Sequence, residues 1–266
     1  LLTVPCSANS ARSAVVLDCV SGRLLLDKKG SEKSLIASTT KIMTALLVCE
    51  RCNVLDQMVI PKQAVGIEGS SMYLKEGERL TLQELLYGLM LSSGNDAAVA
   101  LALYCCGSIQ EFANLMNDKA RSLNMTGSHF ENPNGLDSPN HYSTARDLAI
   151  LASYAMENPI FQKTVSTRTV TVGDRVLRNH NKLLWLYPEA DGVKTGYTKA
   201  AGRILVSSAV RDSRRLVAVT IHDPNDWADH AAMLNRGFEN FRLRRIVTVG
   251  DCVGKLEIVG GDPAQV

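Results

Sequence analysis

A serine and a lysine three residues apart, Ser38 and Lys41, have the clearest capacity for chemistry in this sequence. They precede an apolar run, 42–48, whose pattern predicts a buried helix with the serine in its first turn. Residues i and i+3 lie on one face of a helix, so we expect the lysine amine to reach the serine hydroxyl. A serine becomes a good nucleophile when a base takes its proton, and a lysine can be that base when burial or a second cation lowers its pKa. The pair therefore predicts nucleophilic catalysis by the serine.

Two further motifs supply groups that such a reaction needs. Lys194-Thr195-Gly196 occurs once, in a β-like segment whose glycine lets a ligand approach the backbone. Ser93 and Asn95 lie in a break between two apolar segments, where a loop can present side chains to a cleft. The Ser-x-Asn spacing also occurs at three other places, so it is weak alone. The three motifs in this order, each in a suitable element, make the prediction strong.

Each of these side chains has an expected role. Lys194 is expected to place a second positive charge near Lys41 and to lower its pKa. Ser93 is expected to relay a proton between Lys41 and the leaving amine. Asn95 is expected to hold a peptide carbonyl or the lysine amine, and Thr195 to offer its hydroxyl to a substrate carboxylate.

The backbone supplies the remaining expected group. The N–H groups of Ser38 and Tyr197 are expected to form an oxyanion hole, one at a helix start and one after the Gly196 turn. Plain structural roles compete with these expectations, since Ser38 and Asn95 are both suited to capping helices. Lys194 can likewise belong to an exposed strand end. All three motifs would have to serve only these structural roles for the prediction of catalysis to be wrong.

The elements that must position these groups alternate between helices and strands. Hydrophobic periodicity and turn residues predict an α+β fold, with one antiparallel sheet assembled from distant segments and helices packed on it. Strands are expected at 13–18, 23–26, 58–60, 167–172, 202–209, 216–221, 246–249 and 256–259. Helices are expected at 38–48, 81–91, 96–104, 109–123, 144–156 and 227–241, the second with a capping box of Thr81 and Glu84.

Composition narrows the functional classes. The net charge of +2 gives no argument for binding nucleic acid or an anionic membrane surface. Residues 8–10 have the small-x-small pattern of a signal-peptide cleavage site, which favours secretion. Of seven cysteines, Cys49 and Cys52 have C-x-x-C spacing, but no second pair or histidine cluster completes a zinc site. We expect the cysteines to be mainly small apolar core residues, with a disulfide left open.

The chain resembles the serine-type D-alanyl-D-alanine carboxypeptidases, which are low-molecular-mass penicillin-binding proteins. The three motifs are the set that penicillin-binding proteins share with class A β-lactamases. The resemblance covers nearly all of the chain from Ser13 to Phe241, and beyond the motifs it rests on the segments 69–72, 89–98, 141–145 and 191–198. It implies a β-lactamase/transpeptidase-like fold, with an antiparallel sheet flanked by helices and a mostly helical subdomain.

The resemblance also implies a function. It implies a secreted enzyme of the bacterial cell envelope that removes the terminal D-Ala from peptidoglycan stem pentapeptides through an acyl-serine intermediate. β-Lactam antibiotics are expected to acylate the same serine. No metal or organic cofactor and no nucleic acid partner is implied.

Some positions depart from the family's pattern. Ile36 replaces a frequent proline, Lys199 a frequent aspartate, and Arg203 a common aromatic residue, so the charge at the groove mouth is expected to differ. We expect residues 1–242 to form the peptidase domain and 243–266 to begin a truncated or reduced C-terminal β domain. We expect no membrane anchor in this chain.

Two alternatives remain open. A serine β-lactamase would share the scaffold and the acylation step but would deacylate quickly, in class A enzymes with the help of a glutamate. Glu131 is the candidate for that glutamate, although its sequence context is not the typical one. A non-catalytic wall-binding or penicillin-sequestering protein would keep the groove without releasing D-Ala, and the intact set of reactive residues argues against it.

Overall fold

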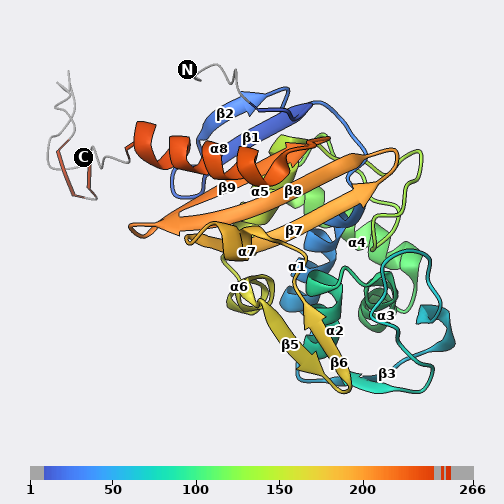
Figure 1. Ribbon diagram of the computed structural model, residues 1–266. Coiled ribbons are helices and arrows are strands. Elements are labelled where there is room, and N and C mark those ends of the chain that lie inside the picture. Colours follow the sequence, from blue (N-terminus) through green and yellow to red (C-terminus); the bar gives the residue numbers. More distant parts are fainter. Residues whose placement is uncertain (1–8, 243–246, 249, 253–266) are drawn as a thin grey trace, which may run out of the picture.

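A five-stranded antiparallel sheet is the frame of the protein, and its strands come from both ends of the chain (Figure 1). The computed structural model describes residues 9–242, 247–248 and 250–252. The strand order is β2-β1-β9-β8-β7. The strands are β1 (Ser13–Asp18), β2 (Leu24–Lys28), β7 (Ala190–Thr198), β8 (Gly202–Arg211) and β9 (Arg214–Ile221). The predicted sheet of distant segments is confirmed, since β1 pairs with β9 along its whole length.

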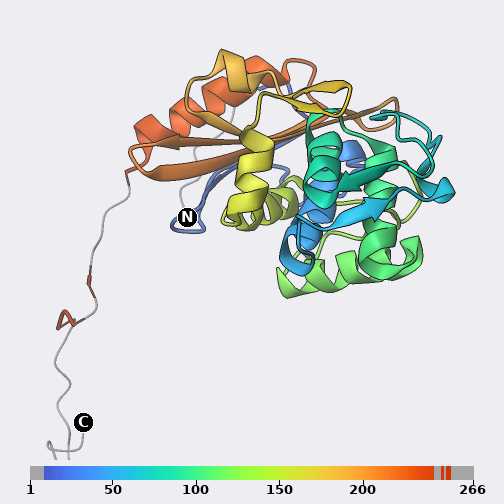
Figure 2. The same cartoon turned by 90° about the horizontal axis from the view of Figure 1, so that it is seen from below.

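The two faces of the sheet bury alternate residues, as the period of two in a strand requires. Val15 and Leu17 of β1 belong to the larger hydrophobic core, which includes α5 (Ala145–Ala155). Ala14 and Val16 point to the opposite face and pack in a second core with Met233 and Leu234 of α8 (Asp226–Asn240). Figure 2 shows the sheet between α8 on one side and α5 on the other.

A helical region packs against the larger core and carries half of the predicted site residues, the other half lying on β7. Its helices are η1 (Ala37–Thr40, a 3₁₀ turn), α1 (Lys41–Arg51), α2 (Leu82–Leu91), α3 (Asn95–Cys106), α4 (Ile109–Ser122) and α6 (Pro159–Ser166). The remaining described elements are η2 (Lys62–Ala64), α7 (Leu183–Leu186), and the hairpins of β3 (Gln57–Val59) with β4 (Arg79–Thr81) and β5 (Thr169–Val172) with β6 (Arg175–Arg178). The predicted capping box of Thr81 and Glu84 is present at the start of α2.

The structure corrects the prediction in two places and leaves a third untested. Ser38 lies in the 3₁₀ turn η1, and the α-helix begins three residues later, because Ala37 has a φ of 45° and sets a tight entry to the helix. Sequence patterns predicted β5 but not its partner β6, and they predicted neither α6 nor α7. The predicted hairpin of 246–249 with 256–259 lies almost entirely outside the described residues.

The cysteines pair in space differently from their spacing in sequence. Cys52, rather than pairing with Cys49, places its Sγ 2.9 Å from the Sγ of Cys105 in α3, and both are free thiols. Within the described residues, no group of three or more His, Cys, Asp or Glu side chains is arranged to hold a metal ion.

None of the helices in the described part of the chain is by itself long and apolar enough to cross a membrane. The consecutive helices α3 and α4 together meet the length and composition test, but they are bent by 85°.

Candidate active site

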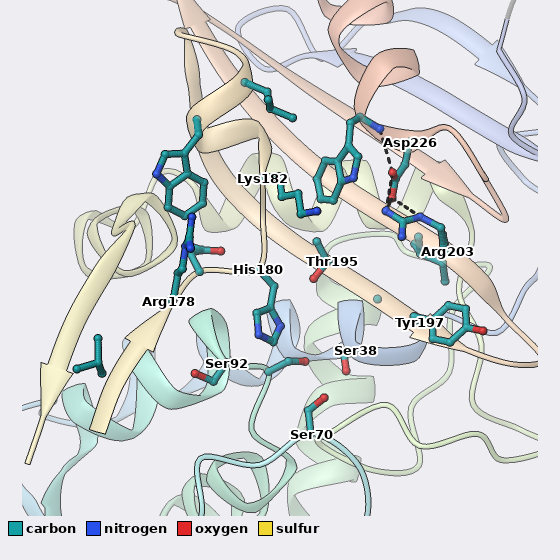
Figure 3. A pocket seen from close by; sticks show the side chains of 18 residues that line it. Ser38, Ser70, Ser92, Arg178, His180, Lys182, Thr195, Tyr197, Arg203 and Asp226 are labelled. Carbon is teal, nitrogen blue, oxygen red and sulfur yellow. Dashed lines mark hydrogen bonds and ion pairs between the residues drawn. The ribbon is translucent and has the colours of Figure 1, made fainter. Parts of the chain in front are cut away.

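A groove of about 1060 Å³ lies where η1, the loop between α2 and α3, and the edge strand β7 meet (Figure 3). The serines of two predicted motifs, Ser38 and Ser93, line it together with Thr195, Gly196 and Tyr197 of the third. Segments separated by more than 150 residues in the sequence therefore meet at one site. The other lining residues are Ser70, Ser92, Val176, Arg178, Asn179, His180, Lys182, Trp185, Leu186, Arg203, Ile204, Asp226 and Trp227.

The turn that carries Ser38 is held by two close backbone approaches. Gly196 of β7 passes so near that an added Cβ would lie 3.2 Å from the Ile36 carbonyl oxygen. Gly135, with a φ of 87°, lies on another side, where a Cβ would overlap the carbonyl of Ala37. The glycine predicted to admit a ligand thus also admits the serine turn itself, and both approaches fix the direction of the nucleophile.

Lys41 is fully buried and has three hydrogen-bond partners. Its Nζ lies 2.8 Å from Ser38 Oγ, 2.7 Å from Asn95 Oδ1 and 2.7 Å from the backbone oxygen of Asn134. The last two atoms can only accept, because Asn95 Nδ2 is committed to the carbonyl of Glu68 at 2.5 Å. A neutral amine has two N–H groups and one lone pair. When both N–H groups donate to the two amide oxygens, the lone pair is left for the serine hydroxyl.

The environment favours the neutral amine. Burial lowers the pKa of Lys41 well below its ordinary value, and the charge of Lys194 lowers it further, while Asp96 acts in the opposite direction. The sequence had named the second lysine as a cause, and the structure makes burial the larger one. Desolvation penalises the charged form of an amine most where water is excluded, as it is here.

Lys194 is itself buried and lies behind the surface of the groove. Its Nζ donates to the backbone oxygen of Thr195 at 2.9 Å, and burial lowers its pKa to about 7. The side chain is absent from the residues that line the groove, whereas Thr195 is among them. Lys194 therefore acts on the site mainly through its charge.

Ser93 occupies a left-handed backbone conformation, with a φ of 60°, immediately before the start of α3. The residue lines the groove, and its hydroxyl makes no hydrogen bond within the described part of the chain. Ser93 makes no hydrogen bond to Lys41, whose amine bonds to Ser38, Asn95 and Asn134. A backbone in this sparsely populated region fits a residue held for function rather than for helix capping.

Asp96, for which the sequence suggested only a capping role at the start of a helix, fixes the neighbouring wall of the groove. Its two carboxylate oxygens accept from Ser71 Oγ at 2.6 Å and from the backbone N–H groups of Met72 at 3.1 Å and Leu74 at 3.0 Å. The loop so held places the Ser70 carbonyl 2.7 Å from the N–H of Asn95. An acidic residue in the first turn of a helix was visible in the sequence, but its partners were not.

The loop after α4 also contributes more than its sequence suggested. Asn134 gives Lys41 its second amide oxygen, and His141 bonds Thr40 Oγ1 through Nε2 at 2.7 Å. His141 Nδ1 accepts from a backbone N–H, so Nε2 carries the proton of a neutral ring, and burial lowers the pKa of this histidine to about 4. The sequence offered a turn-rich stretch, 132–140, and the family resemblance of 141–145, but neither indicated these contacts.

Two other residues singled out in the sequence lie at the edges of the site. Arg203 lines the groove mouth, but its guanidinium is paired with the buried carboxylate of Asp226, with Nη2 to Oδ1 at 2.8 Å. Glu131, the candidate deacylating glutamate, accepts from the hydroxyl of Ser138 and is not among the groove-lining residues. Glu131 therefore does not face the groove, where a deacylating glutamate would have to lie.

Comparisons with known proteins agree with this geometry. The family model described as D-alanyl-D-alanine carboxypeptidase matches residues 3–225. The D-alanyl-D-alanine carboxypeptidase DacF of Bacillus subtilis is 34% identical over 271 residues, covering 96% of this chain and 69% of its own length. DacD of Escherichia coli, which has the same description, is 35% identical over 272 residues, covering 96% and 70%.

Solved structures show the same similarity in three dimensions. The crystal structure of penicillin binding protein 6B from Escherichia coli has a TM-score of 0.87 at 33% identity, covering 93% of this chain and 83% of that one. The D-alanyl-D-alanine carboxypeptidase from Mycobacterium tuberculosis has a TM-score of 0.84 at 32% identity, covering 89% and 94%. The predicted β-lactamase/transpeptidase-like fold is therefore confirmed.

Proposed function

The chain belongs to the D-alanyl-D-alanine carboxypeptidase family of serine hydrolases, and we propose that it removes the terminal D-Ala from peptidoglycan stem pentapeptides through an acyl intermediate on Ser38. The observation that carries this proposal is the set of contacts around Lys41. A buried amine bonded to two oxygens that only accept hydrogen bonds keeps its lone pair for the nucleophile. That is the arrangement a serine needs to be activated without a histidine.

Acylation follows from these contacts. The proton of the Ser38 hydroxyl passes to Lys41 as Oγ forms a bond to the carbonyl carbon of the penultimate D-Ala. The negative charge that develops on the carbonyl oxygen is accepted by the backbone N–H groups of Ser38 and Tyr197. The C–N bond then breaks as the proton held by Lys41 passes through the Ser93 hydroxyl to the leaving nitrogen, so that Lys41 becomes neutral again and free D-Ala departs.

Ser93 performs its relay only when substrate is bound. Its hydroxyl faces the groove without a partner in the described residues, so a bound substrate supplies the nitrogen that it protonates. Hydrolysis of the ester by water then restores Ser38 and releases the shortened peptide. A β-lactam, whose amide mimics the scissile bond, forms the same ester but keeps its leaving group tethered.

The test of this function is release of D-Ala from diacetyl-L-Lys-D-Ala-D-Ala. The wild-type chain should release it, and Ser38→Ala should not. A labelled penicillin should add one molecule per chain to the wild type and none to the variant, as mass spectrometry can show. No release by the wild type contradicts the proposal, and rapid recovery from the acylated state with turnover of nitrocefin points to a β-lactamase instead.

We also propose that the protein acts outside the cytoplasmic membrane. The substrate named above is found there, and the small-x-small pattern at residues 8–10 supports export. Fractionation of cells that express the full-length protein, followed by labelling with a penicillin that does not enter the cytoplasm, tests this location. Labelling only after lysis contradicts it.

A further inference from the structure

The groove contains several basic side chains, but most of them are already occupied. Lys194 is buried and donates to the oxygen of Thr195. Arg203 is held by the carboxylate of Asp226 through Nε at 3.1 Å and Nη2 at 2.8 Å. The pKa of His180 lies below its ordinary value, because burial and the charge of Lys194 disfavour its protonation. None of these groups is a freely available cation at neutral pH.

Lys182 differs from these basic side chains in its exposure and in its lack of a partner. It is the residue immediately before α7, it is exposed, and it lines the groove. Within the described part of the chain its ammonium group has no hydrogen bond or ion pair. Figure 3 shows its side chain extending from the α7 end of the groove toward Thr195, with the Arg203–Asp226 pair beyond. The cation is thus aimed at the residue expected to receive a carboxylate.

The direction of the substrate follows from the order of groups along β7. Thr195 lies on the Lys182 side of Ser38 in the groove, and Tyr197 lies on the other (Figure 3). A substrate with its scissile carbonyl oxygen on the N–H groups of Ser38 and Tyr197 directs its leaving residue toward Thr195. The terminal carboxylate is only two bonds beyond the scissile nitrogen, so it enters the part of the groove that Lys182 faces.

We propose that Lys182 is the residue whose ammonium group pairs with the terminal carboxylate of the substrate, and so selects peptides with a free C-terminal acid. This inference rests on the proposed function. Arg178 is the other lining cation without an ion pair in the described residues, but its guanidinium lies 5.1 Å from the ring centroid of Trp185 and is engaged by that ring. The ammonium of Lys182 is therefore the lining cation that is available as a counter-charge and points toward Thr195 (Figure 3).

A matched pair of substrates tests the proposal. Benzoyl-D-alanyl thiolesters of thioglycolic acid and of thioglycolamide differ only in whether the leaving group ends in a carboxylate or a neutral amide. Lys182→Met should lower kcat/KM for the acid about tenfold, mainly through KM, as expected for loss of a charge-assisted hydrogen bond. The same variant should hydrolyse the amide as the wild type does, and Lys182→Arg should retain the preference for the acid.

Lys199→Met is the control for net charge. Lys199 is an exposed lysine that does not line the groove, so its loss should leave the preference for the acid unchanged. An equal loss in both variants, or an unchanged preference in Lys182→Met, would falsify the assignment. If the wild type hydrolyses neither thiolester nor diacetyl-L-Lys-D-Ala-D-Ala, the proposed function fails. If it hydrolyses all three with no preference for the acid, only the role of Lys182 fails.

Discussion

Replacing Asp96 by asparagine isolates the contribution of one buried carboxylate to the groove. Its Oδ1 accepts from the N–H groups of Met72 and Ala97, and its Oδ2 accepts from Leu74 N–H and the Ser71 hydroxyl. An asparagine has one acceptor oxygen and one NH₂ group. Whichever way the amide turns, its NH₂ faces at least one backbone N–H, and that donor loses its partner.

The expected loss of stability follows from the number of donors that lose their acceptor. An unsatisfied buried donor costs about 1–3 kcal/mol, and the hydrogen bonds that remain become weaker when the acceptor loses its charge. We therefore expect Asp96→Asn to reduce the free energy of unfolding by about 3 kcal/mol, a large part of the roughly 5–15 kcal/mol typical of a domain. The loop concerned includes Tyr73 in a left-handed conformation, with a φ of 62°, which needs such support.

Two assays check the prediction. Denaturation by urea should show the loss of stability, and the rate of acylation by a fluorescent penicillin should fall at least tenfold, because the loop also places the Ser70 carbonyl on Asn95. The charge of Asp96 raises the pKa of Lys41, so its removal should also move the acidic limb of the acylation profile to lower pH. Asp118→Asn, at a side chain 61% exposed, should change stability by less than about 0.5 kcal/mol. If Asp96→Asn is no less stable than that control, the reasoning is refuted.

Three other perturbations have expected results. Lys194→Met should move the acidic limb of the acylation rate to higher pH, since the charge of Lys194 lowers the pKa of Lys41; a limb that stays in place contradicts this. Gly135→Ala should slow acylation at least tenfold because its Cβ would overlap the turn that carries the nucleophile, whereas Gly173→Ala, with similar backbone strain and open space around it, should not. Burial lowers the pKa of His230 to about 3, below the 6.5 of an exposed imidazole, so the unfolded chain binds its proton first as the pH falls. Through this residue the free energy of unfolding should accordingly fall by about 1.4 kcal/mol per pH unit between pH 6.5 and 3. In urea titrations at a series of pH values, the free energy of unfolding of His230→Gln should depend less steeply on pH than that of the wild type. An equal dependence in both proteins is the contrary outcome.

Local patterns in the sequence were sufficient for the reactive groups and the class of fold. The spacing of Ser38 and Lys41 placed hydroxyl and amine on one side of a helical segment, and the structure has them 2.8 Å apart. Alternating apolar residues predicted β8 and β9, and the capping box located the start of α2. These features succeed because they depend on neighbours within a few residues, where backbone geometry alone fixes which side chains share a face.

Other features of the site depend on contacts that cannot be predicted from the types of the residues involved. The backbone oxygen of Asn134 reaches Lys41 only because Gly135 lets its loop approach η1, and a residue of any type at 134 has such a backbone carbonyl. Asp96 looked like an ordinary residue in the first turn of a helix, yet its partners lie 22 to 25 residues earlier in the chain.

The sequence and the tertiary structure therefore each determine a part of the chemistry of the site. The sequence by itself determined which side chains can act as nucleophile, base and relay, since those roles follow from their functional groups. Only the tertiary structure decided that the base is neutral enough to work, because the pKa of Lys41 is lowered first by burial, which exists only once the core has closed around it. The structure also buried Lys194, which the sequence had singled out, behind the groove, and it placed in the groove a second lysine, Lys182, that no motif contained.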